Sequence, residues 1–185
     1  ATEAMYEKLR KPITLPRDRA VQAIHDALYA SKIMSYTQGF MLLRQASKAF
    51  AWPLNCGAVA MMWRGGCIIR SRFLGNIKSA YDNNAALESL LHDPFFQGAV
   101  QTAMAGWREA IKMAIDAGIP APAMSSALAF FDGYTCGRLP ANLIQAQRDY
   151  FGAHTYERVD APRGQHFHTD WTGLDGSVIS GTYDA

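Results

Sequence analysis

The chain has 185 residues, of which 49% are hydrophobic and 18% charged, with a formal net charge of +2. This length is enough for one domain with a sizeable core. The low charge and the lack of a basic run give no reason to expect nucleic-acid binding, and no apolar stretch reaches the roughly 20 residues that span a bilayer. The charged fraction is below the roughly 25% of an average soluble domain. We therefore expect more apolar surface than one small domain can hide, and a partner surface that covers it.

The cysteines argue against a disulfide framework. Cys56, Cys67 and Cys136 are odd in number and widely spaced, and their spacing fits neither paired disulfides nor a metal site. The start of the sequence lacks the order of charge, apolar core and cleavage site that a signal peptide has. We expect reduced, buried thiols in a cytoplasmic protein.

Helical patterns dominate the sequence from Asp18 onward. Residues 1–16 contain two prolines and are interpreted as a segment that leads into the first helix. Apolar residues then recur without an intervening proline over residues 19–50, which predicts one helix up to about 48 Å long at about 1.5 Å per residue. Its middle is apolar on nearly every side, which indicates a central helix buried by its neighbours.

Shorter helices are expected after Pro53. Asn55 can cap the next helix and the Gly65–Gly66 pair can close it. Pro94 suits a first helical position, and Gly118 with the following proline ends that helix. The other predicted helices cover residues 68–81, 123–136 and 141–151. No convincing alternating strand is present, so the predicted fold class is all-α, with a helical domain over residues 17–157.

The last residues have a different character. Residues 158–185 hold five glycines or prolines and show no helical period, which predicts an irregular C-terminal tail. Phe167, Trp171 and Tyr183 make this tail more apolar than a solvated segment requires. We expect the tail to lie against another surface, with a partner subunit as one candidate.

The pattern around Gly152 carries the strongest chemical signal. Arg148 and His154 lie six residues apart across this helix break. An arginine fork holds phosphate or carboxylate from two sides, and a histidine just past a helix end can add a second donor. The pair predicts a binding site for an anionic, oxygen-rich ligand. The alternative is an arginine that satisfies helix-end carbonyls beside an ordinary loop histidine.

Other candidates are weaker. His166 and His168 form an H-x-H pair, but no third ligand stands at usable spacing, so no metal site is predicted. Lys32 lies in the apolar stretch of the long helix and would be a general base if desolvated, although a packed stem with a solvated ammonium is more common. The sequence contains no glycine-rich phosphate loop and no nucleophile elbow. Nothing in this chain alone constitutes an active site.

Six blocks of sequence form an ordered set. They are residues 27–33 (ALYASKI), 38–46 (QGFMLLRQA), 62–71 (MWRGGCIIRS), 117–120 (AGIP), 143–157 (LIQAQRDYFGAHTYE) and 168–173 (HTDWTG). As a set they resemble the C-terminal half of 6-phosphogluconate dehydrogenase. The resemblance runs from about residue 17 to the end and does not usefully cover residues 1–16.

The resemblance implies a function and an assembly. The family carries out the NADP-dependent oxidative decarboxylation of 6-phosphogluconate to ribulose 5-phosphate in the pentose phosphate pathway. Its members are homodimers in which an N-terminal Rossmann domain binds the cofactor and a helical domain supplies the dimer surface. The C-terminal tail threads into the partner subunit.

The resemblance also assigns site residues. It implies that Arg148 and His154 contact 6-phosphogluconate bound in the neighbouring subunit. It implies as well that a tail segment approaches NADP across the dimer, formed by Ser180, Gly181, Thr182 and Tyr183. The family usually has serine at the second and third of these tail positions. It commonly has asparagine where this chain has Asp170.

Two hypotheses therefore stand side by side. In the first, the chain is part of a sugar-phosphate dehydrogenase and supplies the dimer interface and substrate contacts in trans. In the second, it is a non-catalytic helical dimerisation or binding protein. Retention of Arg148 and His154 favours the first. The family's catalytic lysine and glutamate lie upstream of residue 1, and Lys32 lacks their sequence context, so we assign it no role and expect this chain alone to be inactive.

Overall fold

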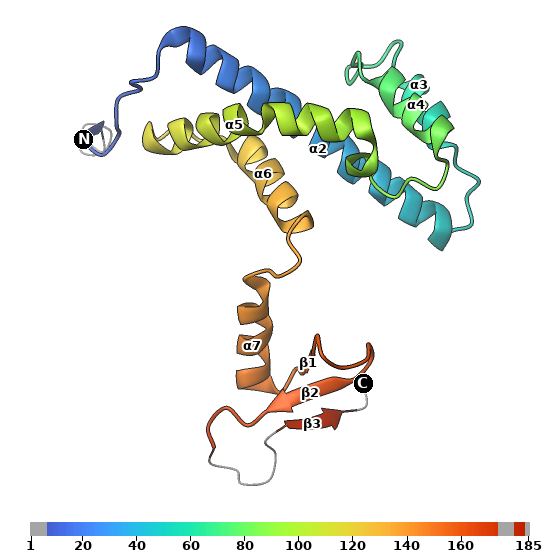
Figure 1. Cartoon of the computed structure of the whole chain (residues 1–185), viewed down its shortest axis with the longest axis vertical. Helices are drawn as coiled ribbons and strands as arrows, with labels where there is room; N and C mark the ends of the chain where they lie inside the picture. Colours follow the sequence, from blue (N-terminus) through green and yellow to red (C-terminus); the bar gives the residue numbers. More distant parts are fainter. Residues whose placement is uncertain (1–6, 174–179, 184–185) are drawn as a thin grey trace. The chain divides into compact units, whose positions relative to one another are not determined.

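The computed structural model describes residues 7–173 and 180–183, and the chain divides into two compact units, residues 1–132 and 133–185 (Figure 1). The fold is mostly helical, as predicted. The helices of the first unit are α2 (Arg17–Ala49), α3 (Cys56–Met62), α4 (Leu74–Asn83), a 3-10 helix (Leu90–His92), α5 (Pro94–Asp116) and α6 (Pro122–Tyr134), which ends in the second unit. In the second unit, α7 (Ala141–Gly152) packs on strands β1 (Tyr156–Glu157) and β2 (His166–Thr169).

Helices α2 and α5 form the centre of the first unit and run antiparallel side by side (Figure 1). Arg19 near the start of α2 donates from Nε to Glu109 Oε2 near the end of α5, at 3.1 Å. The two helices approach closely at Gly106, where an added Cβ would lie 2.3 Å from Oδ2 of Asp26. The long helix predicted over residues 19–50 is therefore confirmed, and α5 is the helix that packs beside it.

The apolar core of the first unit is built from helices α2, α4 and α5 and the 3-10 helix. Its largest fully buried side chains are Trp107, Phe40, Phe96, Ile33, Met34, Leu74, Ile77 and Leu90. The middle of the long helix is largely buried, as predicted, through Ile33, Met34 and Phe40, but its first third is not. Val21, Ile24 and Leu28 lie at helical spacing on α2 and remain 58%, 45% and 57% exposed. The expected excess of apolar surface is thus confirmed.

Several helix ends follow local sequence rules, but α3 ends at Met62, before the Gly65–Gly66 pair that was predicted to close it. Asn55 caps α3 by accepting a hydrogen bond from Ala58 N at 2.9 Å, as predicted. Asp93 caps α5 in front of Pro94, and Gly118 follows the helix at φ 65°. The helix predicted over residues 68–81 starts too early, because α4 begins only at Leu74. Ile68 is 98% exposed, so burial of this apolar side chain gives no support to a helix that starts there.

Two further sequence predictions are corrected or narrowed. Of the three cysteines, only Cys56 is buried; Cys67 is half-buried and Cys136 is exposed. Burial raises the pKa of the Cys56 thiol. Lys32 is half-buried, with its Nζ 5.9 Å from the centroid of the Phe73 ring. This cation–π contact agrees with a packed lysine and gives no support to a general base.

The second unit corrects the prediction of an irregular tail. Helix α7 is followed by a three-stranded antiparallel sheet in the order β1 (Tyr156–Glu157), β2 (His166–Thr169) and β3 (Ser180–Tyr183). The strands are two to four residues long, too short for an alternating pattern to be recognised in the sequence. Within the described residues, no helix has the length and apolar character needed to cross a bilayer.

Candidate ligand-binding site at the end of helix α7

Arg148 and His154 lie at the two sides of a turn that ends helix α7. The helix ends at Gly152, as the sequence predicted, and Ala153 follows in the left-handed conformation at φ 49°. Thr155 also has a positive φ, 59°. Arg148 and His154 are both exposed, so both side chains are accessible to a ligand. No hydrogen bond or ion pair joins them directly within the described part of the chain.

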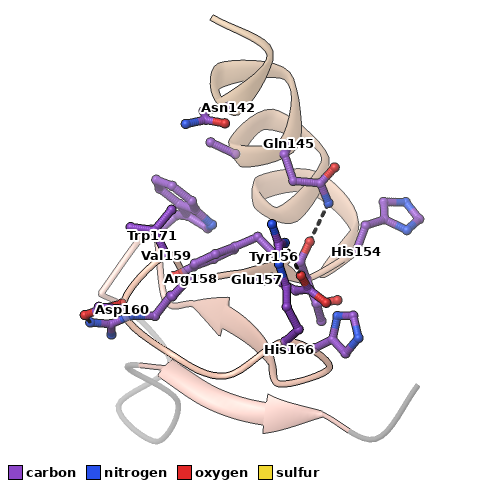
Figure 2. A pocket seen from close by; sticks show the side chains of 13 residues that line it. Asn142, Gln145, His154, Tyr156, Glu157, Arg158, Val159, Asp160, His166 and Trp171 are labelled. Carbon is purple, nitrogen blue, oxygen red and sulfur yellow. Dashed lines mark hydrogen bonds and ion pairs between the residues drawn. The ribbon is translucent and has the colours of Figure 1, made fainter. Parts of the chain in front are cut away.

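Gln145 links the arginine to this turn. Its side-chain Oε1 accepts a hydrogen bond from Arg148 Nη1 at 3.2 Å. Its Nε2 donates to the carbonyl oxygen of Thr155 at 2.5 Å (Figure 2). One amide therefore contacts both the arginine and the residue that follows His154. The rest of the Arg148 side chain is exposed, so its other guanidinium donors are accessible from solvent.

Asp149 is the buried centre of the unit. Its side chain has no exposed surface, and its carboxylate accepts hydrogen bonds from four groups. They are Thr155 N at 3.0 Å, His168 Nδ1 at 3.0 Å, Thr169 N at 3.0 Å and Trp171 Nε1 at 2.9 Å. Burial alone would raise the pKa of this carboxyl, but the hydrogen bonds from His168, Thr169 and Trp171 outweigh it, and the pKa is lowered. The ionised carboxylate ties the helix end to the sheet.

The H-x-H pair has a structural explanation. His168 is half-buried on β2, and its Nδ1 contacts the carboxylate of Asp149. His166 lies two residues earlier on the same strand and lines a cavity. No group of three or more His, Cys, Asp or Glu residues suited to a metal ion occurs among the residues described. Asp149 is thus a hydrogen-bond partner of His168.

An open cavity of about 930 Å³ adjoins the helix end. His154 and His166 lie on one side of it and Asp160 and Trp171 on the other (Figure 2). Its formal charges are paired within the wall: Arg158 contacts Asp160 at 2.5 Å, and Arg163 contacts Glu157 at 2.5 Å. The hydrogen bond from Arg163 lowers the pKa of Glu157. Because Arg158 and Arg163 are already paired, these two arginines of the cavity wall are not free to bind an anion.

Arg148 lies at the edge of an exposed apolar side of α7. Leu143, Ile144, Tyr150 and Phe151 are 75%, 61%, 61% and 66% exposed. Ile144 precedes Arg148 by four residues and Phe151 follows it by three, so all three share one side of the helix. A partner that covers this side would remove water from around the guanidinium and strengthen its attraction for an anion.

The tail residues Ser180, Gly181, Thr182 and Tyr183 form strand β3. Their backbones pair with β2 in the register Thr169↔Ser180, His168↔Gly181, Phe167↔Thr182 and His166↔Tyr183. β3 is one of the two edge strands of the sheet described, with β1 at the other edge. Asp170, where the family commonly has asparagine, accepts from Gly173 N at 2.8 Å and Thr172 N at 3.2 Å through Oδ1. An asparagine Oδ1 would accept the same bonds, so the change is accommodated.

Sequence reasoning missed Gln145 and Asp149. Both lie in the block of residues 143–157, but a glutamine and an aspartate on a helix are ordinarily solvated. The one local signal was the aspartate between an arginine and a helix-ending glycine. Its burial depends on Trp171 and His168, which lie 22 and 19 residues further along the chain.

The fold and the helix end together define a mostly helical domain that presents an arginine–histidine pair suited to an anionic ligand. The sequence matches the family described as 6-phosphogluconate dehydrogenase, C-terminal domain, over residues 1–171. The chain belongs to this family. The family match includes residues 1–16, which corrects the expectation that the resemblance begins near residue 17.

Named relatives agree with this membership. The chain is 54% identical over 184 residues to the decarboxylating 6-phosphogluconate dehydrogenase of Haemophilus influenzae, covering 100% of this chain and 38% of the relative. It is 56% identical over 183 residues to the enzyme of Ovis aries, covering 97% and 38%. A solved structure of Plasmodium falciparum 6-phosphogluconate dehydrogenase, described as apo and with NADP+ or 6-phosphogluconate, is similar with a TM-score of 0.82 and 42% identity, covering 92% of this chain and 36% of that one. The chain thus spans little more than a third of these relatives.

Proposed function

We propose that the chain is the C-terminal portion of an NADP-dependent 6-phosphogluconate dehydrogenase. The enzyme would convert 6-phosphogluconate to ribulose 5-phosphate by oxidative decarboxylation, in the pentose phosphate pathway and in the cytoplasm. Family membership over residues 1–171 supports the activity. Three free cysteines, one of them exposed, suit a reducing compartment.

The observation that carries the proposal is the exposure of Arg148 and His154 at one helix end. The planar guanidinium can donate two parallel hydrogen bonds to a phosphate or carboxylate, and the imidazole can add a third donor. These residues bind and orient the anionic substrate and perform no bond-breaking step. The acid–base chemistry belongs to residues upstream of this chain, as the family resemblance implies.

We propose further that these contacts are made in trans within a homodimer. The apolar side of α7 around Arg148 is left exposed by its own unit. A two-fold interface would cover it and deliver the arginine to the partner's substrate at the same time. The exposed apolar residues Val21, Ile24 and Leu28 on α2 provide additional surface for such an interface.

The tail fits a contribution to the cofactor site. β3 is an edge strand, and an edge strand offers unpaired backbone N–H and C=O groups. Ser180, Gly181, Thr182 and Tyr183 would therefore hold NADP mainly through the backbone, since two usual serines are Gly181 and Thr182 in this chain. NADP, when bound, supplies the hydride acceptor.

A mixed dimer tests the trans arrangement. The complete enzyme is co-expressed as two differently tagged subunits, one with Arg148→Ala and one with its upstream catalytic lysine replaced, and dimers carrying both tags are purified. Contact in trans leaves one intact site per dimer and about half the wild-type activity. Contact in cis leaves no intact site. Failure to recover any doubly tagged dimer would instead favour the alternative of a protein that does not assemble as proposed.

A further inference from the structure

The turn after α7 has a left-handed backbone conformation that residues other than glycine rarely adopt. Ala153 and Thr155 both have positive φ values, 49° and 59°, although neither is glycine. Such residues persist only where the surrounding structure holds them, and they cluster at functional sites. The two flank His154 directly. The groups that hold them therefore decide where the imidazole lies.

Asp149 and Gln145 are the residues that hold the turn of Ala153 and Thr155 in place. Asp149 contributes its carboxylate to Thr155 N at 3.0 Å and its backbone carbonyl to Ala153 N at 3.0 Å. Gln145 holds the carbonyl of Thr155. His154 is thus fixed on both sides. The carboxylate is itself anchored by β2 and Trp171, so it cannot follow a movement of the turn.

Gly152 provides the space that His154 occupies. A Cβ added at Gly152 would lie 2.7 Å from Nε2 and 2.9 Å from Cδ2 of His154, closer than packed atoms allow. The ring also contacts Phe151, with centroids 6.3 Å apart and planes at 84°. The imidazole therefore folds back over the last turn of α7 and does not extend away from it.

This position brings His154 to the side of the helix that carries Arg148. Gly152 follows Arg148 by four residues, and such Cβ positions lie about 5–6 Å apart on one helix face. Since Nε2 of His154 lies 2.7 Å from the Cβ position of Gly152, it lies within about 9 Å of the Arg148 Cβ. One ligand placed between the two side chains can reach both.

We infer that Asp149 is a positioning residue that holds the turn of residues 153–155 so that His154 lies beside Arg148. Gly152 must lack a side chain because a Cβ there would displace the His154 ring from this position. The inference rests on the proposed function, since it takes Arg148 and His154 as the substrate contacts. It assigns Asp149 no contact with substrate. It predicts instead that changes at Asp149 and Gly152 act through His154.

A double-mutant cycle in the complete enzyme tests this dependence. KM and kcat for 6-phosphogluconate are measured for Gly152→Ala, for Asp149→Asn and for each combined with His154→Ala. Gly152→Ala alone should raise KM about tenfold, the effect of losing one charge-assisted hydrogen bond. In the His154→Ala background it should change KM by less than about twofold, because coupled residues are not additive. Asp149→Asn should show the same dependence on His154.

Gly133→Ala is the matched control, since an added Cβ there meets nothing within 4 Å. It should leave KM unchanged. Full additivity of Gly152→Ala with His154→Ala, or no effect of Gly152→Ala while His154→Ala raises KM, would overturn the inference and leave the proposed function standing. If His154→Ala and Arg148→Lys both leave KM unchanged, the proposed function fails and the inference fails with it. Gly152→Ala still decides the question if Asp149→Asn does not fold.

Discussion

The first unit buries Trp107, Phe40 and Phe96 in a continuous apolar core, whereas Asp149 is the one buried side chain described in residues 133–173 of the second. Apolar burial is non-directional and tolerates small movements. A buried carboxylate with four donors is directional and requires each donor in place. The first unit is therefore stabilised mainly by its apolar core, and the second unit is organised around the hydrogen-bond geometry of Asp149.

Both units leave apolar residues exposed, the first unit on α2 among other places and the second on α7. The second unit leaves Leu143, Ile144, Tyr150 and Phe151 of α7 largely in solvent, so its helix has an apolar side that its own unit does not cover. A unit of this kind gains most from a partner that supplies the missing core. If the second unit binds ligand as proposed, packing and ligand binding are divided between the units, and substitutions in one unit or the other should separate the two roles.

The largest expected effect is a complete loss of activity. The 185-residue chain by itself should not reduce NADP with 6-phosphogluconate, because neither unit, over its described residues, contains an acid–base pair beside a cofactor domain. Absorbance of the reduced cofactor at saturating substrate measures this. Turnover near the roughly 10 s⁻¹ typical of enzymes, from contaminant-free chain, would contradict it.

In the complete enzyme, Arg148→Lys should weaken 6-phosphogluconate binding roughly 10- to 150-fold. The substitution keeps the charge but replaces a planar fork with a point donor, and a charge-assisted hydrogen bond contributes about 1.5–3 kcal/mol. NADP affinity serves as the internal control and should barely change. His154→Asn should weaken the same ligand non-additively. If Arg148→Lys disturbs only stability, Arg148 is a helix-end residue.

The core of the first unit should be sensitive to alkali at Tyr81. Burial raises the pKa of this buried phenol from 10.0 to about 12. The folded state therefore favours the neutral form, and its stability contribution is complete below pH 10 and is lost as the pH rises toward 12. The loss should reach about 3 kcal/mol. The tyrosinate absorbance of wild type minus Tyr81→Phe measures the pKa, and ionisation near 10 would refute the prediction.

Gly106→Ala should destabilise the first unit by about 1–3 kcal/mol. The new Cβ would lie 2.3 Å from Oδ2 and 2.9 Å from Cβ of Asp26, between α2 and α5. Gly98→Ala is the matched control on the same helix, because its Cβ meets nothing within 4 Å. That control should stabilise by up to about 1 kcal/mol through helix propensity. Thermal unfolding of the two variants should shift in opposite directions.

The smallest expected effect is the loss of stability of the second unit in acid. The pKa of Asp149 is lowered below its ordinary 3.8. Its contribution to stability is thus complete above about pH 3.8 and is lost as the pH falls through the folded-state pKa. The indole N–H resonance of Trp171, which donates to Asp149, should keep its position down to that range. If this resonance shifts at a higher pH in the wild type and does not shift in Asp149→Asn, the Asp149 carboxylate is not stabilised.

Much of the fold could be read from local sequence. The period of apolar residues predicted α2, α5 and α7, and Asn55, Pro94 and Gly118 marked helix ends. These features are local because a helix hydrogen-bonds within itself and its caps lie within a turn of its ends. The same local pattern also placed Arg148 and His154 on the two sides of a helix break, because a glycine at the end of an apolar period is itself a local signal.

Tertiary structure alone decided the late start of α4, the small sheet and the burial of Asp149. A short strand is defined by its neighbour and not by its own two to four residues. The carboxylate is buried only because Thr155, His168, Thr169 and Trp171 converge on it from 6 to 22 residues away. Its role depends on those distant donors, and no residue type or spacing near position 149 encodes where they will lie.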